Sequence, residues 1–291
     1  MKNPVKRVAA IHDLSGFGRA SLTAIIPILS SMGIQVCPFP TAILSTHTGG
    51  FEEFTFIDLT DTMEAYFNHW KKEQIEFDCI YSGFLGSPKQ IDIISEFISD
   101  FKRVDNLVVI DPVMGDNGSL YQTMDHEMVM KMKDLIKNAD IITPNFTEAA
   151  LLLDKPFSRF IKESEIKEWL AELADMGPDI VIITSVIDES QPDNTNVIAF
   201  DKSNNKYWKV SCKYIPAFFP GTGDAFTSVL IGSLLQGDSL PIALDRSVNF
   251  ITSAIRASYG FTYPQREGVL IEKVLDTLKL PVLSSSYELL E

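Results

Sequence analysis

Short apolar segments rich in valine and isoleucine alternate with longer amphipathic segments along most of this chain, and this alternation restricts its fold more than any other feature. The short segments are apolar throughout, which is typical of strands buried on both faces of a parallel sheet. The longer segments carry apolar residues at helical spacing. The regular strand-then-helix order predicts a single-domain, doubly wound α/β fold with a mainly parallel sheet flanked by helices.

The predicted strands are Val8–Ile11, Ile34–Phe39, Cys79–Tyr81, Leu107–Ile110, Asp140–Thr143, Ile180–Thr184, Asn196–Phe200 and Tyr207–Cys212. The predicted helices are Ala20–Met32, Asp61–Glu73, Pro88–Phe101, His126–Asn138, Thr147–Leu153, Glu163–Asp175, Thr222–Gln236, Pro241–Tyr259 and Glu267–Leu278. The last two strands are predicted to form a hairpin. Because no linker-like stretch divides the sequence, we expect one domain over residues 1–280 and a C-terminal tail over residues 281–291.

The acidic balance of the chain excludes some classes of partner. A net charge of −14 over 291 residues argues against a nucleic-acid or anionic-membrane surface. A small phosphate ligand is compatible with this charge, because backbone N–H groups at a helix start bind anions locally. The N-terminus has no long apolar segment and the three cysteines are far apart, so we expect a cytoplasmic protein with reduced thiols.

The stretch "FFPGTGDAF" carries the strongest functional signal. Gly221, Thr222 and Gly223 form a predicted tight turn before a helix. Glycines let the backbone approach a ligand, and the unpaired N–H groups of the first turn stabilise a negative charge such as a transferred phosphoryl group. Asp224 lies in that turn, where it either caps the helix or accepts a proton from an attacking hydroxyl group.

Two further stretches place carboxylates directly after predicted strands. "VVIDPVMGD" places Asp111 at a strand end and Asp116 in the next loop, and one or two carboxylates beside phosphates are enough to bind hydrated Mg²⁺. "ITPNFTE" places Asn145 three residues before Glu148. This pair either forms a capping box or faces a hydrated metal ion and phosphates.

A third strand end carries hydroxyl groups. "VIITS" ends in Thr184 and Ser185, where a nucleotide phosphate could lie. Parallel strands bring their carboxyl ends to one edge of the sheet, and doubly wound folds bind ligands beyond that edge. We therefore expect all these strand ends to line a single site.

The opening stretch "IHDLSGFGRAS" suggests a different class of enzyme, a dinucleotide-dependent oxidoreductase. Such a loop requires a third glycine and an acidic residue about twenty positions further on to bind the ribose. Here Ser21 stands in place of the third glycine, and the following stretch "GIQVCPFPTAI" contains no acid. The sequence therefore disfavours a dinucleotide site.

The combined motifs resemble the ribokinase-like superfamily of small-molecule kinases, and within it the pyridoxal kinase branch. "STHTGG", "SGFLG", "DPVMGD", "ADIITPNFTEAALL", "VIITS" and "FFPGTGDAF" all match that branch. The resemblance extends from about residue 8 to about residue 237. It implies ATP-dependent phosphorylation of the 5'-hydroxymethyl group of a vitamin B6 vitamer, which is pyridoxal, pyridoxine or pyridoxamine.

The resemblance also implies roles for individual residues. Asp224 would be the catalytic base, and Gly221, Thr222 and Gly223 would form an anion hole for the γ-phosphoryl group. Mg²⁺ would be held by Asp111, Asp116 and Glu148, and a monovalent cation often assists in the family. The residues implied to bind ATP are Asp111, Asp116, Thr143, Asn145, Glu148, Thr184, Ser185, Ile215 and Thr222.

The vitamer side matches less completely. The residues implied to bind substrate are Asp13, His47, Thr48, Phe84, Tyr121 and Asp224. Asp13 stands where the branch usually has a serine, and Phe84 stands where it usually has a tyrosine. An anionic Asp13 would suit a protonated or amine-bearing vitamer.

Two alternatives to a pyridoxal kinase stay open. "DLSG" at residues 13–16 resembles the "DPSG" stretch of hydroxymethylpyrimidine kinases of thiamine biosynthesis, although that branch normally has a glutamine where Thr46 stands. The other alternative is a catalytically silent vitamer-binding protein on the same fold. Relatives are often dimers, so we expect a homodimer.

Overall fold

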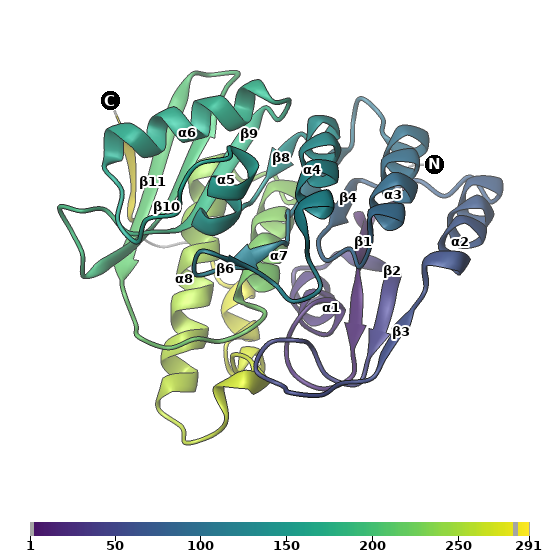
Figure 1. Cartoon of the computed structure of the whole chain (residues 1–291), viewed down its shortest axis with the longest axis horizontal. Coiled ribbons are helices and arrows are strands. Elements are labelled where there is room, and N and C mark those ends of the chain that lie inside the picture. Colours follow the sequence, from purple (N-terminus) through teal and green to yellow (C-terminus); the bar gives the residue numbers. More distant parts are fainter. Residues whose placement is uncertain (1–2, 282–284, 291) are drawn as a thin grey trace.

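A ten-stranded sheet forms the centre of the molecule in the computed structural model, which describes residues 3–281 and 285–290 (Figure 1). Its strand order is β12-β11-β10-β9-β8-β5-β4-β1-β2-β3. The strands from β9 to β2 in this order run parallel, whereas β3 and β10 to β12 are antiparallel to their neighbours. The strands are β1 (Arg7–Ser15), β2 (Gln35–Leu44), β3 (Phe56–Asp58), β4 (Cys79–Ser82), β5 (Leu107–Ile110), β8 (Ile141–Ile142), β9 (Ile180–Val186), β10 (Asn194–Asp201), β11 (Lys206–Lys213) and β12 (Tyr287–Leu290).

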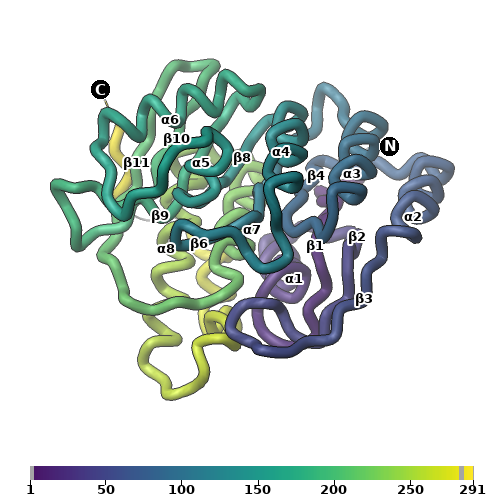
Figure 2. The backbone as a smooth tube through the Cα atoms, viewed as in Figure 1, coloured from purple at the N-terminus to yellow at the C-terminus, as the bar shows by residue number. Residues whose placement is uncertain are grey.

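Helices cover both faces of this sheet (Figures 1 and 2). One layer contains α2 (Thr60–Lys72), α3 (Pro88–Phe101), α4 (His126–Leu135), α5 (Phe146–Leu152) and α6 (Glu163–Asp175). The other contains α1 (Leu22–Ser31), α7 (Thr222–Leu235) and α8 (Leu240–Tyr259). Successive residues of β1 enter opposite cores, since Ile11 packs in the first layer and Ala10 in the second. The predicted doubly wound fold is confirmed.

Several short elements complete the chain. A two-stranded sheet of β6 (Gly115–Asp116) and β7 (Ser119–Leu120) follows β5. The 3₁₀ turns are η1 (Ile136–Asn138), η2 (Gln265–Glu267), η3 (Ile271–Lys273) and η4 (Leu275–Lys279). Within the described parts of the chain, no helix is both long enough and apolar enough to cross a membrane.

Each predicted strand is present, and the hairpin is the antiparallel pair β10–β11. The helix predicted over Glu267–Leu278 is wrong, because this segment contains the last residue of η2 and the two short 3₁₀ turns η3 and η4. Gly268 has a φ of 81° and Val274 a φ of −124°, and neither is a helical conformation. Val274 and Leu278 still pack into the core, which accounts for the helix-like apolar spacing.

The predicted C-terminal tail over residues 281–291 is partly ordered into the sheet. Tyr287–Leu290 pairs with β11 as the edge strand β12, and Tyr287 packs edge-on against Trp208. Ser286 is also tied down, since its backbone N–H and its hydroxyl both donate to Asp245. Residues 282–284 and 291 of the predicted tail lie outside the described residues.

Candidate active site

A cavity of about 1010 Å³ lies at the carboxyl ends of the parallel strands. Its volume is at the upper end of the range for small-molecule sites, which suits two ligands bound together. All the site residues predicted from the sequence line it: Asp13, His47, Thr48, Phe84, Asp111, Asp116, Tyr121, Thr143, Asn145, Glu148, Thr184, Ser185, Ile215, Gly221, Thr222, Gly223 and Asp224. The predicted convergence of the strand ends is therefore confirmed, while the role of each residue stays a prediction.

The start of α7 presents backbone N–H groups to the cavity. Gly221 precedes the helix in the left-handed conformation with a φ of 81°. A Cβ atom at Gly221 would lie 2.0 Å from the carbonyl oxygen of Arg19, so only glycine fits between α7 and the β1–α1 loop. As a glycine, Gly221 has no side chain with which to cap the helix. The N–H groups of the first turn, which have no intrahelical acceptors, are therefore available to an anion.

Asp224 lies in this first turn with its side chain 14% exposed. The backbone N–H of Ser21 donates to its Oδ2 at 2.8 Å, and His12 Nδ1 lies 3.7 Å from its Oδ1. Burial raises the pKa of Asp224 to about 7, with the Ser21 hydrogen bond opposing the rise and Asp13 adding to it. Complete burial lowers the pKa of His12 to about 3, so its imidazole is neutral. A carboxylate with a pKa near 7 matches the requirement for a general base at neutral pH.

Asn145 and Glu148 form a capping box at the start of α5. The Glu148 N–H donates to Asn145 Oδ1 at 2.9 Å, and the Asn145 N–H donates to Glu148 Oε2 at 2.8 Å. The N–H of Met114 donates to the other oxygen, Glu148 Oε1, at 3.0 Å. The pair also lines the cavity, so both interpretations of this motif describe the same residues.

Asp111 adds a second carboxylate close to Glu148. Burial raises its pKa well above the usual range, and the nearby carboxylates of Glu148 and Asp224 raise it further. Asp116 is half-buried at the β6–β7 hairpin, and its Oδ1 accepts the N–H of Asn117. Among the described residues, no three His, Cys, Asp or Glu side chains are arranged as a metal-binding group.

The remaining predicted ATP residues lie on neighbouring strand ends. Thr143 is buried, and its hydroxyl accepts a hydrogen bond from Thr227 of α7 at 3.1 Å. Ser185 is exposed and has a φ of 61°, an uncommon conformation for serine that turns the end of β9. Thr184 and Ile215 line the cavity between these groups.

The other end of the cavity contains the predicted vitamer residues. Asp13 is 4% exposed and Phe84 is 9% exposed, whereas Tyr121 is 37% exposed. His47 Nδ1 accepts the Gly49 N–H, so Nε2 carries the ring proton and donates to the Arg266 carbonyl at 2.6 Å. Burial lowers the pKa of His47, which keeps this ring neutral. Thr48 lies next to it in the cavity wall.

Sequence reasoning missed several polar residues of the cavity, and Ser21 and Arg159 are two of them. Ser21 contacts both Asp13 and Asp224, but in the sequence it resembles an ordinary residue at a helix start. Arg159 lies in the loop between α5 and α6. The sequence signal that could have identified Arg159 is an arginine close to two phenylalanines in an acidic chain.

Comparison with known proteins decides the family. Residues 17–268 match the family described as phosphomethylpyrimidine kinase. This chain belongs to the phosphomethylpyrimidine kinase family. As a member of that family it is a phosphotransferase, and its relatives identify the pyridoxal kinase branch. "Pyridoxal kinase" of Arabidopsis thaliana is 27% identical over 96% of this chain and 88% of its own length.

Two solved structures of family relatives superpose over nearly the whole chain. A candidate phosphomethylpyrimidine kinase from Bacteroides thetaiotaomicron, crystallised with pyridoxal, is 56% identical and covers 98% of this chain and 100% of its own, with a TM-score of 0.95. The pyridoxal kinase of Lactobacillus plantarum is 30% identical and covers 95% of this chain and 97% of its own, with a TM-score of 0.85.

Proposed function

We propose that the protein transfers the γ-phosphoryl group of ATP to the 5'-hydroxymethyl group of a vitamin B6 vitamer, with Asp224 as the general base. The observation that carries this proposal is the position of Asp224. A carboxylate with its pKa raised to about 7 lies in the first turn of an uncapped helix, inside one cavity that also contains the predicted ATP and vitamer residues. The Bacteroides thetaiotaomicron relative, 56% identical and crystallised with pyridoxal, supports a vitamer as the acceptor.

In the proposed reaction, Asp224 takes the proton of the vitamer hydroxyl as its oxygen attacks the γ-phosphorus. The new O–P bond forms while the bond between the γ-phosphorus and the oxygen bridging to the β-phosphate breaks, and ADP leaves. The open N–H groups after Gly221 stabilise the charge on the transferred group. Positioning and electrostatic stabilisation supply most of what phosphoryl transfer requires.

The carboxylates beside this helix start are suited to Mg²⁺. The carboxyl groups of Asp111, Glu148 and Asp224 lie close together, and this proximity adds to burial in raising the pKa of Asp111. A divalent cation would relieve that repulsion and, when bound, neutralises charge on the phosphates. Both oxygens of Glu148 already accept backbone N–H groups, so this residue would act on the metal through water. Asp111 and Asp116 would be the nearer ligands.

We assign the ATP end to the strand-end residues Thr143, Asn145, Thr184 and Ser185, with Ile215 beside the base. Their position along one edge of the sheet supports this assignment. The vitamer end would be formed by His47, Thr48, Phe84 and Tyr121, together with Asp13. A monovalent cation, a homodimer and a cytoplasmic location stay predictions.

Two observations favour a second acceptor. The family description names phosphomethylpyrimidine, and "DLSG" at residues 13–16 resembles the corresponding stretch of hydroxymethylpyrimidine kinases. A hydroxymethylpyrimidine presents the same kind of primary alcohol to Asp224 and would need no change in the phosphate end of the site.

A coupled assay of ADP formation separates these functions. We expect ATP turnover with at least one of pyridoxal, pyridoxine and pyridoxamine, and the corresponding 5'-phosphate as product. A kcat/KM that is higher for hydroxymethylpyrimidine than for every vitamer would show that the protein is a hydroxymethylpyrimidine kinase. Binding of vitamers without ADP formation from any of the four acceptors would identify a silent binding protein.

A further inference from the structure

Ser21 has a backbone conformation that its sequence does not explain. Its φ is 51° and its ψ is −137°, directly before α1, in a region that glycine adopts easily and other residues rarely. A conformation of this kind persists only where surrounding contacts enforce it. Ser21 is 7% exposed, so those contacts come from the protein interior.

The backbone N–H of Ser21 explains what this conformation achieves. It donates to Asp224 Oδ2 at 2.8 Å, from a position distant in the sequence. With Oδ2 held in this way, Oδ1 is the carboxylate oxygen left to accept a proton. The neutral His12 ring lies 3.7 Å from Oδ1 and makes no hydrogen bond to it.

The hydroxyl of Ser21 explains how the conformation is enforced. It donates to Asp13 Oδ1 at 2.5 Å, and the hydroxyl of Ser15 donates to Asp13 Oδ2 at 2.7 Å. Buried hydrogen bonds between a hydroxyl and a carboxyl group restrict the orientation of both side chains. Each oxygen of Asp13 is therefore engaged by a neighbouring serine, although the residue lines the cavity.

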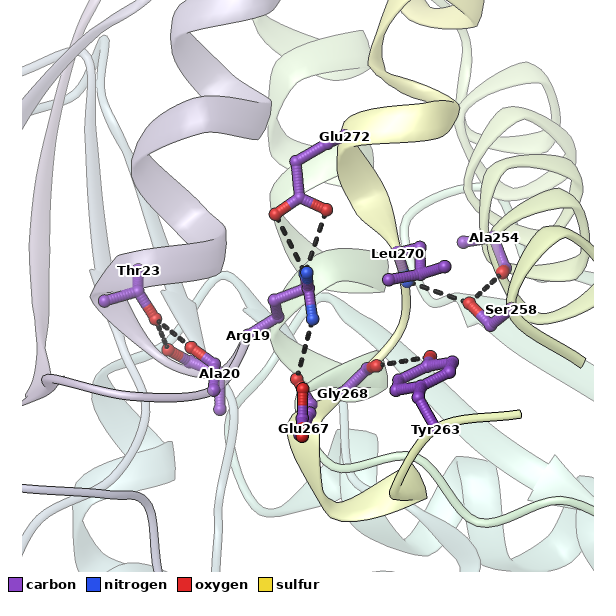
Figure 3. A network of polar contacts seen from close by, with 11 residues as sticks. Arg19, Ala20, Thr23, Ala254, Ser258, Tyr263, Glu267, Gly268, Leu270 and Glu272 are labelled. Carbon is purple, nitrogen blue, oxygen red and sulfur yellow. Dashed lines mark hydrogen bonds and ion pairs between the residues drawn. The ribbon is translucent and has the colours of Figure 1, made fainter. Parts of the chain in front are cut away.

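The rest of the β1–α1 loop is fixed by other contacts (Figure 3). The Arg19 Nε donates to both oxygens of Glu272, and its Nη1 donates to the Glu267 carbonyl at 3.2 Å. The Thr23 hydroxyl contacts the Ala20 carbonyl at 2.7 Å. Gly221 closes the other side, since it has no room for a side chain against Arg19. With both flanks fixed, Asp13 holds Ser21 through its hydroxyl group, while the Ser21 carbonyl accepts the N–H groups of Ala24 and Ile25 in α1.

We propose that Asp13 is a positioning residue for the catalytic base: it holds Ser21 in the left-handed φ region, so that the Ser21 N–H fixes the orientation of the Asp224 carboxylate. This proposal rests on the proposed function, in which Asp224 is the base. In this proposal the aspartate that replaces the usual serine positions the base, and its role is not to recognise charge on the vitamer.

Steady-state kinetics of Asp13 and Ser21 variants test this role. We expect Asp13→Ala and Ser21→Ala to lower kcat by about 10- to 100-fold, because a small misplacement of a reacting group has effects of that size. The KM for ATP should change by less than about threefold in both variants, and so should the KM for the vitamer in Ser21→Ala, because the Ser21–Asp224 hydrogen bond orients the base and is not a contact to either substrate. Asp13→Asn, which keeps the shape and one acceptor oxygen, should lose less than Asp13→Ala.

The pair Ser21→Ala and Ser21→Gly separates positioning from simple structural damage. Both remove the hydroxyl, but glycine adopts the left-handed φ without strain, so Ser21→Gly should retain about fivefold more kcat than Ser21→Ala. Ser15→Ala is the matched control, because it removes the other hydroxyl on Asp13 and leaves the bond to Ser21 in place. Its kcat should stay within about threefold of the parent, since it breaks no contact to Asp224.

Three results would overturn the proposal: parental kcat in Ser21→Ala, equal kcat in Ser21→Ala and Ser21→Gly, or an Asp13→Asn variant that changes the KM ratio of the vitamers at unchanged kcat. Thermal unfolding verifies that each variant is folded, and if Asp13→Ala is not, Asp13→Asn and the Ser21 pair decide the question. A parent protein that phosphorylates no acceptor refutes the proposed function. An active parent with unaffected variants refutes only the role of Asp13.

Discussion

Helices α5 and α7 begin at the same edge of the sheet, and each carries an acidic residue in its first turn, yet the two helix starts are constructed differently. At α5, Asn145 caps the helix, and both oxygens of Glu148 accept backbone N–H groups. At α7, Gly221 replaces a capping side chain, and Asp224 accepts one backbone N–H from a distant loop. Burial raises the pKa of both carboxylates.

Because burial raises the pKa of Glu148 and of Asp224 alike, burial alone does not identify which of the two carboxylates would act as a base. Each oxygen of Glu148 accepts a backbone N–H, and the bond from Met114 connects the β5–β6 loop to α5. Asp224 keeps one oxygen without a hydrogen bond among the described residues, beside N–H groups that no side chain caps. The unsatisfied groups are those on which chemistry can act.

The largest effect is expected at Asp224. Asp224→Asn removes the general base and preserves the size of the side chain, so kcat should fall by about 10²- to 10⁴-fold. ATP affinity should change little, because the base acts in the transition state. Initial rates of ADP formation and calorimetric titration with a non-hydrolysable ATP analogue measure the two quantities.

Asp61→Asn is the matched control, since Asp61 also lies in the first turn of a helix but is 96% exposed at its side chain. This control should have parental kcat. A kcat for Asp224→Asn within tenfold of the parent would mean that another group accepts the proton.

The next largest effect is expected on stability at Glu148. Glu148→Ala leaves the N–H groups of Met114 and Asn145 without acceptors, which should lower the free energy of unfolding by about 2–4 kcal/mol. Glu148→Gln keeps one acceptor oxygen and should cost about half as much. Urea denaturation with circular dichroism measures both, and Glu127→Ala, in the exposed first turn of α4, should cost little. Equal stability of Glu148→Ala and Glu127→Ala would refute the structural role.

The smallest effect concerns the pH dependence of stability at Asp224. Its folded pKa of about 7 lies above the ordinary value of 3.8, so the folded state binds a proton that the unfolded state has already lost between these values. The parent without ligands should therefore lose stability as the pH rises from 6 to 8, by about 1 kcal/mol more than Asp224→Asn. Denaturant midpoints at both pH values measure this difference. Parallel changes in the two proteins would mean that the pKa of Asp224 is not raised.

Local patterns in the sequence were sufficient for the sheet, for most helices and for the α5 start. The capping box needs only Asn145 and Glu148 three residues apart, and the αL glycine needs only its place before α7. Such features are encoded within one turn of the chain, so a pattern search can find them. The convergence of the strand ends followed from the parallel sheet, because its geometry brings those ends to one edge.

Features that depend on contacts between distant parts of the chain could not be predicted from local sequence patterns. The predicted first helix began at Ala20, but α1 begins at Leu22, because Ser21 is held out of helical geometry by Asp13 and Asp224. The pairing of β12 with β11 is a contact between segments about 80 residues apart in the sequence, so no local pattern in Tyr287–Leu290 indicates it. In both cases a tertiary contact overrides the local preference.

The cavity itself has a stereochemical consequence. Because one cavity contains both the strand ends near Thr184 and the wall near His47, we expect the phosphate donor and the acceptor alcohol to bind in it together. We then expect the phosphoryl group to pass directly from ATP to the alcohol in one displacement, without a phosphorylated form of the enzyme. A single in-line displacement inverts the configuration at phosphorus. With ATP made chiral at the γ-phosphorus, the phosphorylated product should therefore have the opposite configuration at that atom.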